Sequence, residues 1–315
     1  MAHVRELAEL IDRHSGTDGI HATAIPRLVL YRASRIEEPM YAVHQPAVCF
    51  VAQGRKQAIA GEGVYAYDAE KYLVVSVGVP TVGQILEASP EKPFLCLALL
   101  LDAAAIGALM VESDIELAGR APPGSALSVS TLEPELVDTC IRLVRLLGSP
   151  RDIPVLAPLA EREILYRLLR GDQATRMSQI ACAESRLHDV NRAISWIKRH
   201  FRSAMSIEAL ASEARMSTSA LHQNFKVVTG VSPLQFQKHL RLLEARRLML
   251  SQAVDAAAAG HSVGYESASQ FSREYRRLFG APPVRDIAKL REQWGSEFPD
   301  FQQILAERVT APSSV

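Results

Sequence analysis

Cysteine is scarce in this sequence, and neither the four cysteines nor the nine histidines form a metal-binding pattern. The four cysteines lie far apart, with no CxxC pair and no histidine at the spacing of a zinc site. The β-rich region 25–101 contains a single histidine, His44, where a metal site would need several grouped with a carboxylate. We therefore expect no metal and no other cofactor. Widely spaced cysteines are also typical of a reducing compartment, so we expect a cytoplasmic protein.

Long hydrophobic runs are missing too. The two longest, Phe94–Leu101 and Ala103–Val111, are separated by Asp102 and are too short to span a bilayer, which needs about 20 apolar residues. The first residues are polar and lack the apolar centre of a signal peptide. The sequence also lacks a Ser/His/Asp set, a glycine-rich phosphate loop and a pair of catalytic acids, so it does not predict an enzyme.

Charge of one sign is not in excess over the whole chain, which has 35 basic and 35 acidic residues among its 315. This neutral total combines two parts of opposite net charge. Residues 186–290 carry 16 Lys and Arg against 8 Asp and Glu, a net charge of +8, and the remainder carries 19 against 27, a net charge of −8. A basic part joined to an acidic one is typical of a nucleic-acid-binding module attached to a domain that does not adhere to phosphates.

The N-terminal half predicts an antiparallel β domain. From about Ile25 to Leu101, short β-rich runs alternate with turn residues, and such spacing favours a sandwich or a small barrel. Gly61-Glu62-Gly63 is expected to form a hairpin turn, and Gly78-Val79-Pro80 is expected to break the chain. The expected strands are 48–52, 57–60, 64–67, 72–77, 82–88 and 94–101.

The middle of the chain predicts helices. Asp102 is the expected N-cap of a helix over 103–111. Two amphipathic helices follow over 133–147 and 155–169, and such a pair outside a barrel is either a lid on the core or a subunit interface. We expect the pair to hold a homodimer. The polar stretch 171–185 is the expected interdomain linker.

The last third of the chain contains the same helix-turn-helix pattern twice, with corresponding residues fifty positions apart. Ser217 and Ser267 are the expected N-caps of two helices, and Gly230 and Gly280 are the expected C-terminal stops. Two tandem recognition helices indicate duplex DNA rather than catalysis. The other expected helices of this part cover 186–201, 207–214, 233–250 and 254–260.

The second copy resembles the signature of AraC/XylS-type transcription regulators. The resemblance lies in Val263–Tyr275, continued by Leu278-Phe279-Gly280 and Pro282-Pro283, and the first copy fits it with Phe225-Lys226 and Thr229–Pro233. Stretches 48–55, 72–77, 87–90 and 153–169 resemble the cupin-like N-terminal domain of one subgroup of this family.

The resemblance implies an α+β protein of two domains. The first is a cupin-like antiparallel β-barrel with a flanking helix pair, and the second is an all-α domain with two helix-turn-helix motifs. The expected boundaries are 20–170 for a sensor and dimerisation domain, 171–185 for the linker, 186–292 for the DNA-binding domain and 293–315 for a tail without an assigned role.

Two positions depart from the family pattern. Arg215 stands at the turn of the first copy, where Gly is frequent, and an Arg held at positive φ costs about 1 kcal/mol relative to Gly. Gly260 stands inside a helix of the second copy, at a cost of about 1 kcal/mol. We expect reduced local stability at both positions.

The exposed faces of the two recognition helices carry the residues expected to contact DNA. Gln bonds adenine and Arg bonds guanine with two hydrogen bonds, and the first turns of a recognition helix reach the bases. On the family pattern, the base-contacting residues are Ser219, His222, Gln223, Ser269, Gln270 and Arg273. The residues expected at phosphates are Ser217, Lys226, Ser267, Arg276 and Arg277. The helix over 233–250 is the expected rigid connector, which would separate the readers by about 34 Å, one turn of B-DNA.

A small-molecule effector is expected in the β domain, in a pocket lined by Cys49, Gln53, Arg55, Tyr65 and Tyr67. Cys49 and Cys96 are expected to be packing residues, and a thiol sensor built on either is the alternative. The predicted function is a sequence-specific transcription regulator that binds double-stranded promoter DNA as a homodimer, with RNA polymerase as a further candidate partner. Two other classes stay open: a cupin-type metalloenzyme, and an architectural DNA binder without sequence preference.

Overall fold

The computed structural model describes residues 2–115, 122–183, 185–252 and 254–294 and divides into two compact units, the first reaching His188 and the second beginning at Asp189. Among these residues, no helix combines the length and the apolar character needed to cross a bilayer. The first unit contains, in chain order, α1 (Ala2–Ser15), β1 (Gly19–Ala22), β2 (Leu28–Ala33), β3 (Met40–His44), β4 (Ala47–Gln53), β5 (Arg55–Ala60), β6 (Gly63–Asp68), β7 (Lys71–Val75), β8 (Val79–Glu87), β9 (Phe94–Leu100), α2 (Ala103–Glu112), β10 (Leu127–Thr131), α3 (Pro134–Arg145), the short 3-10 helix η1 (Leu146–Gly148), α4 (Ile153–Arg170) and α5 (Ala174–Ala181). The remaining helices are α6 (Arg186–His200), α7 (Ile207–Glu213), α8 (Thr218–Thr229), α9 (Pro233–Ser251), α10 (Ala256–Ser262), α11 (Ala268–Phe279) and α12 (Pro283–Trp294).

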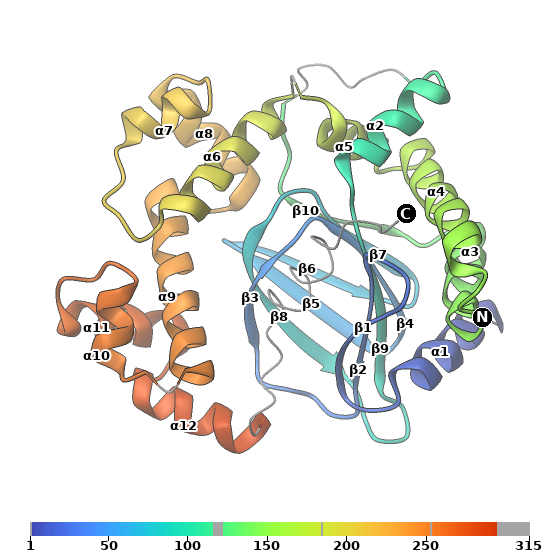
Figure 1. Cartoon of the computed structure of the whole chain (residues 1–315), viewed down its shortest axis with the longest axis horizontal. Coiled ribbons are helices and arrows are strands. Elements are labelled where there is room, and N and C mark those ends of the chain that lie inside the picture. The colour runs from blue at the N-terminus through green and yellow to red at the C-terminus, as the bar shows by residue number, and fades with distance from the viewer. Residues whose placement is uncertain (1, 116–121, 184, 253, 295–315) are drawn as a thin grey trace. The chain divides into compact units, whose positions relative to one another are not determined.

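The strands of the first unit form two antiparallel sheets (Figure 1). One has six strands in the order β1-β2-β9-β4-β7-β10, and the other has four in the order β3-β8-β5-β6. The predicted fold class is confirmed, with one difference. Backbone pairing in the described residues joins the strands into two separate sheets rather than one closed barrel.

Both faces of the six-stranded sheet are covered, which explains its continuous apolar sequences. In β4, Val48 and Phe50 belong to the core that the sheet shares with the helices, and Cys49 faces the other side. Helix α1 lies on β2, β4 and β9 and contacts α3, which in turn contacts α4. A strand buried on both faces has no solvent side and therefore shows no polar alternation.

Several elements differ from the sequence-based expectation. Helix α1 was not predicted, although Leu7, Leu10 and Ile11 bury one stripe at helical spacing. Strand β10 was not predicted either. Pro80 does not break the chain but lies in β8 opposite Val43 of the edge strand β3. Its missing N–H is tolerated because β8 pairs with β5 only over 82–87, so Pro80 lies outside that pairing.

The segment expected to be a linker contains a helix. Helix α5 contacts α2 and α4, and its Met177 is fully buried. The short apolar set of this helix is interrupted by polar residues, so its periodicity was too weak to predict. Of the expected tail 293–315, residues 293 and 294 end α12, and 295–315 lie outside the described residues.

In the second unit, α9 runs between the helix pair α7–α8 and the pair α10–α11 (Figure 1). The predicted caps are confirmed. Ser217 accepts a hydrogen bond from the backbone N–H of Ala220, and Ser267 accepts one from Gln270. Gly230 (φ 75°) and Gly280 (φ 81°) end α8 and α11 in the left-handed conformation.

The two departures from the family pattern have different physical explanations. Arg215 does adopt a positive φ, of 54°, as expected from its place in the turn. Gly260 has a packing reason instead of the expected softness: a Cβ built there would lie 2.8 Å from the Cγ atom of Phe271. The absence of a side chain at Gly260 is what lets α11 approach α10 so closely.

Candidate functional site

The recognition helices bury one stripe and expose the opposite face. Leu221, Phe225 and Val228 on α8 are buried, as are Phe271 and Tyr275 on α11, so these aromatic residues are core residues as expected. The residues predicted to contact DNA are all exposed: Ser217, Ser219, His222, Gln223 and Lys226 on or before α8, and Ser267, Ser269, Gln270, Arg273, Arg276 and Arg277 on or before α11.

Basic side chains on the recognition helices are available to bind an external anion, whereas those on the connector helix α9 are engaged within the protein. In the described part of the chain, Lys226, Arg273 and Arg277 make no ion pair. On α9, by contrast, Lys238 pairs with Glu274 at 2.9 Å, and Arg241 donates to the carbonyl oxygens of three residues outside α9. These connector cations hold the unit together, whereas Lys226 on α8 and Arg273 and Arg277 on α11 remain able to bind an external anion.

A buried charge cluster fixes α11 against its neighbours. The Arg246 guanidinium donates two hydrogen bonds of 2.8 Å to the Asp286 carboxylate, which also accepts one of 2.7 Å from the Tyr275 hydroxyl. Arg246 and Asp286 are 8% and 6% exposed. Burial raises the pKa of Tyr275, and the Asp286 charge adds to the effect, so its hydroxyl stays protonated as a donor. The cluster links α9, α11 and α12.

Gln270, one of the residues predicted to contact bases, is hydrogen-bonded to a carboxylate on the same helix. Its Nε2 donates to the Glu274 carboxylate at 3.2 Å, and the same carboxylate accepts hydrogen bonds from Lys238 and Tyr265. Burial alone would raise the pKa of Glu274, but these donors outweigh it and lower the pKa below its usual value. The ionised carboxylate orients the Gln270 amide.

The first unit contains a small cavity between its two sheets, of about 30 Å³. That is room for one or two water molecules. Its aliphatic lining comes mainly from β1, β2 and β9, and its polar lining is made by Tyr31, His44, Gln45, Lys56 and Tyr67, with the thiols of Cys49 and Cys96 beside them.

Of the five residues predicted to line an effector pocket, Cys49 and Tyr67 lie on this cavity and three do not. Gln53 donates to the carbonyl oxygen of Pro93, Tyr65 bonds Ser125, and Arg55 is exposed. Lys56, the neighbour of Arg55, takes the inward position instead. The β5 pairing is irregular between Arg55 and Lys56, and β4 has a similar shift near Gln53.

The register explains this difference, because a shift of one residue moves a side chain to the other face of a sheet. Buried Ala58 and Ala60 place the even-numbered residues of β5 inside. That alternation became visible only in the structure.

The cysteines on the cavity are protonated packing residues rather than nucleophiles. Burial raises the pKa of Cys49 to about 11 and raises that of Cys96 as well, although Lys56 opposes both shifts. His44 is held neutral, because burial lowers its pKa to about 4. In the described residues, no group of three or more His, Cys, Asp and Glu side chains is arranged to hold a metal ion.

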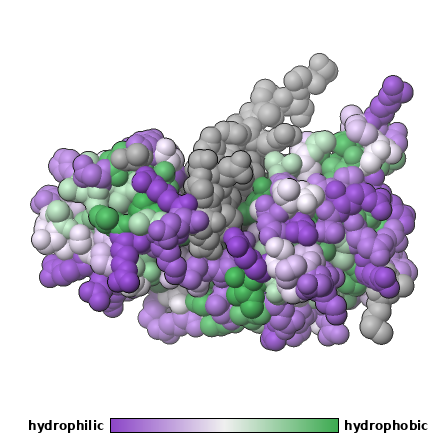
Figure 2. Space-filling model, turned by 90° about the horizontal axis from the view of Figure 1, so that it is seen from below, coloured by the Kyte–Doolittle hydropathy of each residue, from purple (hydrophilic) through white to green (hydrophobic). Residues whose placement is uncertain are grey.

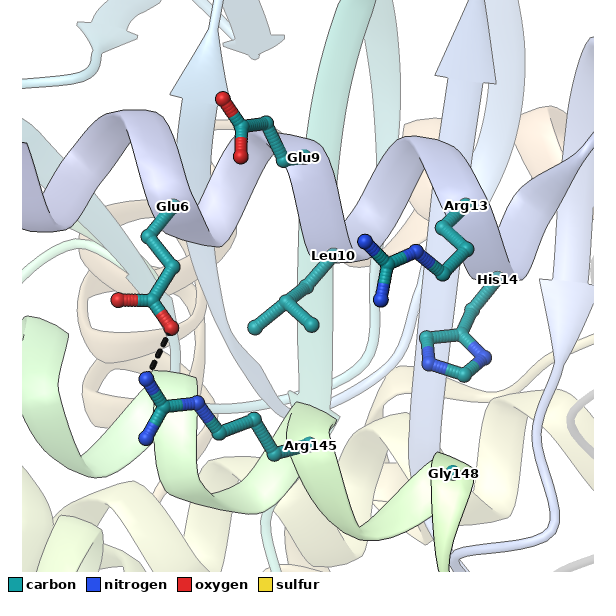
Figure 3. Close-up of a pocket in the computed structure, with 7 residues that line it drawn as sticks. All are labelled: Glu6, Glu9, Leu10, Arg13, His14, Arg145 and Gly148. Carbon is teal, nitrogen blue, oxygen red and sulfur yellow. Dashed lines mark hydrogen bonds and ion pairs between the residues drawn. The ribbon is translucent and has the colours of Figure 1, made fainter.

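A second hollow lies on the surface between α1 and the end of α3 (Figure 3). It measures about 410 Å³ and is open to solvent; Glu6 and Arg145, on its two sides, form an ion pair. Hydrophilic residues predominate on the face of the molecule shown in Figure 2, in keeping with such charged surface grooves. Mixed charges in an open groove do not define a binding site for one class of ligand.

Two family models match this chain. The model described as "AraC-type transcriptional regulator N-terminus" matches residues 24–176, and a "Helix-turn-helix domain" model matches residues 210–286. Among characterised relatives, the chain is 33% identical over 147 residues to the HTH-type transcriptional activator RhaS of Escherichia fergusonii, covering 44% of this chain and 49% of that protein. This match thus spans about half the length of the relative. A RhaS protein of Shigella dysenteriae is 26% identical over 246 residues, 77% of this chain and 81% of the relative.

Solved structures of ToxT from Vibrio cholerae have the same fold. One, described as bound to an unsaturated fatty acid, superposes with a TM-score of 0.55 at 11% identity and covers 82% of this chain and 94% of its own. Another, bound to (E)-4-(8-methylnaphthalen-1-yl)but-3-enoic acid, superposes with a TM-score of 0.56 at 12% identity and covers 84% and 99%.

Proposed function

The chain belongs to the AraC/XylS-type family of transcription regulators, and from this premise we propose how it reads DNA, how it assembles and where it is controlled. The observation that carries the proposal is the pair of matching recognition helices, α8 and α11, with equivalent caps and fully exposed polar faces. Each helix enters one major groove, and α9 sets their separation at about one turn of B-DNA.

Base contacts come from the first turns of each helix. On α8 these are Ser219, His222 and Gln223, and on α11 they are Ser269, Gln270 and Arg273. Lys226, Arg276, Arg277 and the hydroxyls of Ser217 and Ser267 contact phosphates. Because Glu274 accepts only one of the two amide hydrogens of Gln270, the carbonyl oxygen and the second N–H remain to read a base. The oxygen would accept from an exocyclic amine of adenine or cytosine.

Two copies of the chain associate through α4. The outer face of this helix exposes an apolar stripe of Val155, Leu159 and Tyr166, with Leu156 beside it, while its inner face is buried against the core. An identical stripe on a second copy would cover it about a two-fold axis. Linking two DNA-binding units on one operator raises avidity through effective concentration, without any new contact to bases.

An effector in the β sandwich controls these activities. The cavity between the sheets and the fold shared with the ligand-bound ToxT structures support this assignment. An effector shifts the protein between an active and an inactive arrangement only by binding one of them more tightly. We place the protein in the cytoplasm, without an enzymatic activity of its own, with RNA polymerase as the partner through which it regulates transcription. No observation in the described residues favours the metalloenzyme.

The test begins with the operator. Genomic fragments retained by the purified full-length chain are sequenced, and the shared motif is used in binding titrations. We expect Arg273→Ala and Gln223→Ala each to relax preference at one base position, with a loss of about 1–3 kcal/mol against the correct base. Arg277→Ala should weaken binding to all sequences alike and lower the salt dependence by about one phosphate contact.

The exposed Arg13 of α1 provides the charge control, because Arg13→Ala removes the same charge outside the DNA-binding unit. Uniform weakening by Arg273→Ala on every sequence, random DNA included, would reassign that residue to phosphate. Retention of random fragments without a common motif would favour the architectural binder instead.

A further inference from the structure

The cavity between the sheets contains a cation that interacts electrostatically with the buried Glu37 carboxylate but forms no ion pair with it. Lys56 points inward from β5, and its Nζ lies 4.7 Å from the centre of the Tyr31 ring and 5.9 Å from that of Phe94. In the described part of the chain it makes neither a hydrogen bond nor an ion pair. Cation–π contacts attract the ammonium group but leave its three donors unused.

The neighbouring strand makes room for this lysine. A Cβ built at Gly83 of β8 would lie 3.2 Å from the Cε of Lys56. A side chain at Gly83 would therefore require the end of Lys56 to shift by a few tenths of an ångström. The glycine leaves the space that the inward path of Lys56 uses.

Tyr67 provides a second unused donor. It lies on the same cavity and is 2% exposed, and its hydroxyl has no hydrogen-bond partner among the residues described. Because Tyr67 lines the cavity, a ligand oxygen there could accept the hydrogen bond of its hydroxyl. Burial raises the pKa of Tyr67 well above its usual value, so the hydroxyl remains a donor at neutral pH.

Apart from the Gln45 side chain, the other polar groups of the cavity are already engaged. The Nδ1 of His44 donates to the carbonyl oxygen of Gln45 at 2.9 Å, which leaves its Nε2 as the acceptor for the Cys49 thiol at 3.7 Å. The Cys96 thiol donates to the backbone carbonyl of Leu97. Tyr31 donates to the buried Glu37 carboxylate at 2.8 Å. Free donors outnumber free acceptors, and one of the donors carries a positive charge.

We propose that the effector is a carboxylate, whose oxygens accept hydrogen bonds from Lys56 Nζ and Tyr67 Oη, with an apolar body against the aliphatic side of the cavity. This inference rests on the proposed effector control and specifies its chemistry. Charge-assisted hydrogen bonds from an ammonium to a carboxylate are stronger than neutral ones, the more so between two sheets.

The size of the cavity sets a condition on binding. A volume of about 30 Å³ is too small for a carboxylic acid with more than a few atoms, so the sheets must separate where the body enters. Strand β1 lies at the edge of the six-stranded sheet, is four residues long, pairs only with β2, and contributes Ile20 to the lining. Its displacement opens the aliphatic side without disturbing Lys56 or Tyr67.

Calorimetric titration of the full-length protein without DNA tests the proposal. The probes are butyrate, octanoate and benzoate, each beside its neutral amide. We expect at least one carboxylate to bind and its amide to bind at least tenfold more weakly. Lys56→Met should weaken the carboxylate at least tenfold, and Tyr67→Phe, which preserves the ring and the fold, several-fold. Lys71→Met removes an exposed lysine on β7 and should leave binding unchanged.

Three outcomes would overturn the proposal. These are equal affinity for acid and amide, unchanged affinity in both cavity variants, or no binding of any probe when it is in 10-fold excess over a protein concentration sufficient for detection. Operator titrations run in parallel separate this outcome from a failure of the proposed function. Intact operator binding without carboxylate binding rejects the ligand class alone. Carboxylate binding by a protein that recognises no operator rejects the regulatory role and leaves the ligand site standing.

Discussion

Removing the Asp286 carboxylate should destabilise the DNA-binding unit far more than an ordinary substitution. In Asp286→Ala the buried guanidinium of Arg246 loses its two hydrogen bonds to the carboxylate, and Tyr275 loses the acceptor of its hydroxyl. Breaking one side of a buried ion pair costs about 3–5 kcal/mol, compared with about 5–15 kcal/mol for the whole stability of a typical domain. The second recognition helix should suffer first, because the cluster joins α11 to α9 and α12.

Urea unfolding followed by tryptophan fluorescence measures this loss in the right part of the molecule. Both tryptophans of the chain, Trp196 and Trp294, belong to the second unit, so their emission reports on it selectively. With a denaturant dependence of about 2 kcal/mol per molar urea, the midpoint should fall by roughly 2 M. Tyr275→Phe, which leaves the ion pair in place, should cost only about 1.5 kcal/mol.

A paired substitution separates the unpaired charge from lost packing. Arg246→Met combined with Asp286→Leu removes both charges, so most of the lost stability should return. A loss below about 1 kcal/mol in Asp286→Ala would refute the reasoning, since it would mean that the Arg246 charge reaches water without its partner. A double variant as unstable as the single one would show that the cluster acts through shape and not through charge.

Three further predictions follow from other contacts. Gly260→Ala should destabilise the second unit by about 1–3 kcal/mol, because the added methyl would meet the Phe271 ring at 2.8 Å; the same fluorescence titration measures the loss, and a neutral Gly260→Ala would contradict the packing argument. Because burial depresses the pKa of His44 from 6.5 to about 4, the unfolded chain binds more protons than the folded one between these pH values. The first unit should therefore be fully stabilised above pH 6.5 and lose stability as the pH falls towards 4. In circular dichroism melts, His44→Gln should lose less stability over this pH range, and an unchanged pH dependence would argue against a buried neutral imidazole. Leu159→Asp should convert the dimer into monomers in sedimentation velocity and weaken operator binding, while Val111→Asp, at a still more exposed apolar site on α2, should do neither. A dimeric Leu159→Asp would remove α4 from the interface.

Local rules were sufficient for the parts of the fold whose signals lie close together in the sequence. Ser217 and Ser267 cap their helices as the pattern predicts, and Gly230 and Gly280 end them with positive φ. Caps, stops and the 3.6-residue stripe depend on neighbours within about one or two helical turns, so a single chain segment contains all the information. The fold class and the family followed from the same signals.

The cavity depended on contacts that the sequence does not display. Arg55 was predicted to line it and Lys56 takes that place, because an irregularity of the β5 ladder decides which of two adjacent residues faces inward. The meaning of Gly260 likewise became visible only with Phe271 beside it.

The basic residues of α9 show most clearly what the sequence determines and what only the tertiary structure decides. The sequence by itself determined that Lys238, Arg241 and Arg246 lie on a connector between two DNA-reading helices, but it did not determine what they bind. Only the tertiary structure brought Glu274 and Asp286 to Lys238 and Arg246, from helices about 40 residues further on. A basic residue is equally compatible with a phosphate, with water and with a buried carboxylate. Which one it meets depends on how distant segments are packed, and that is a property of the folded chain as a whole.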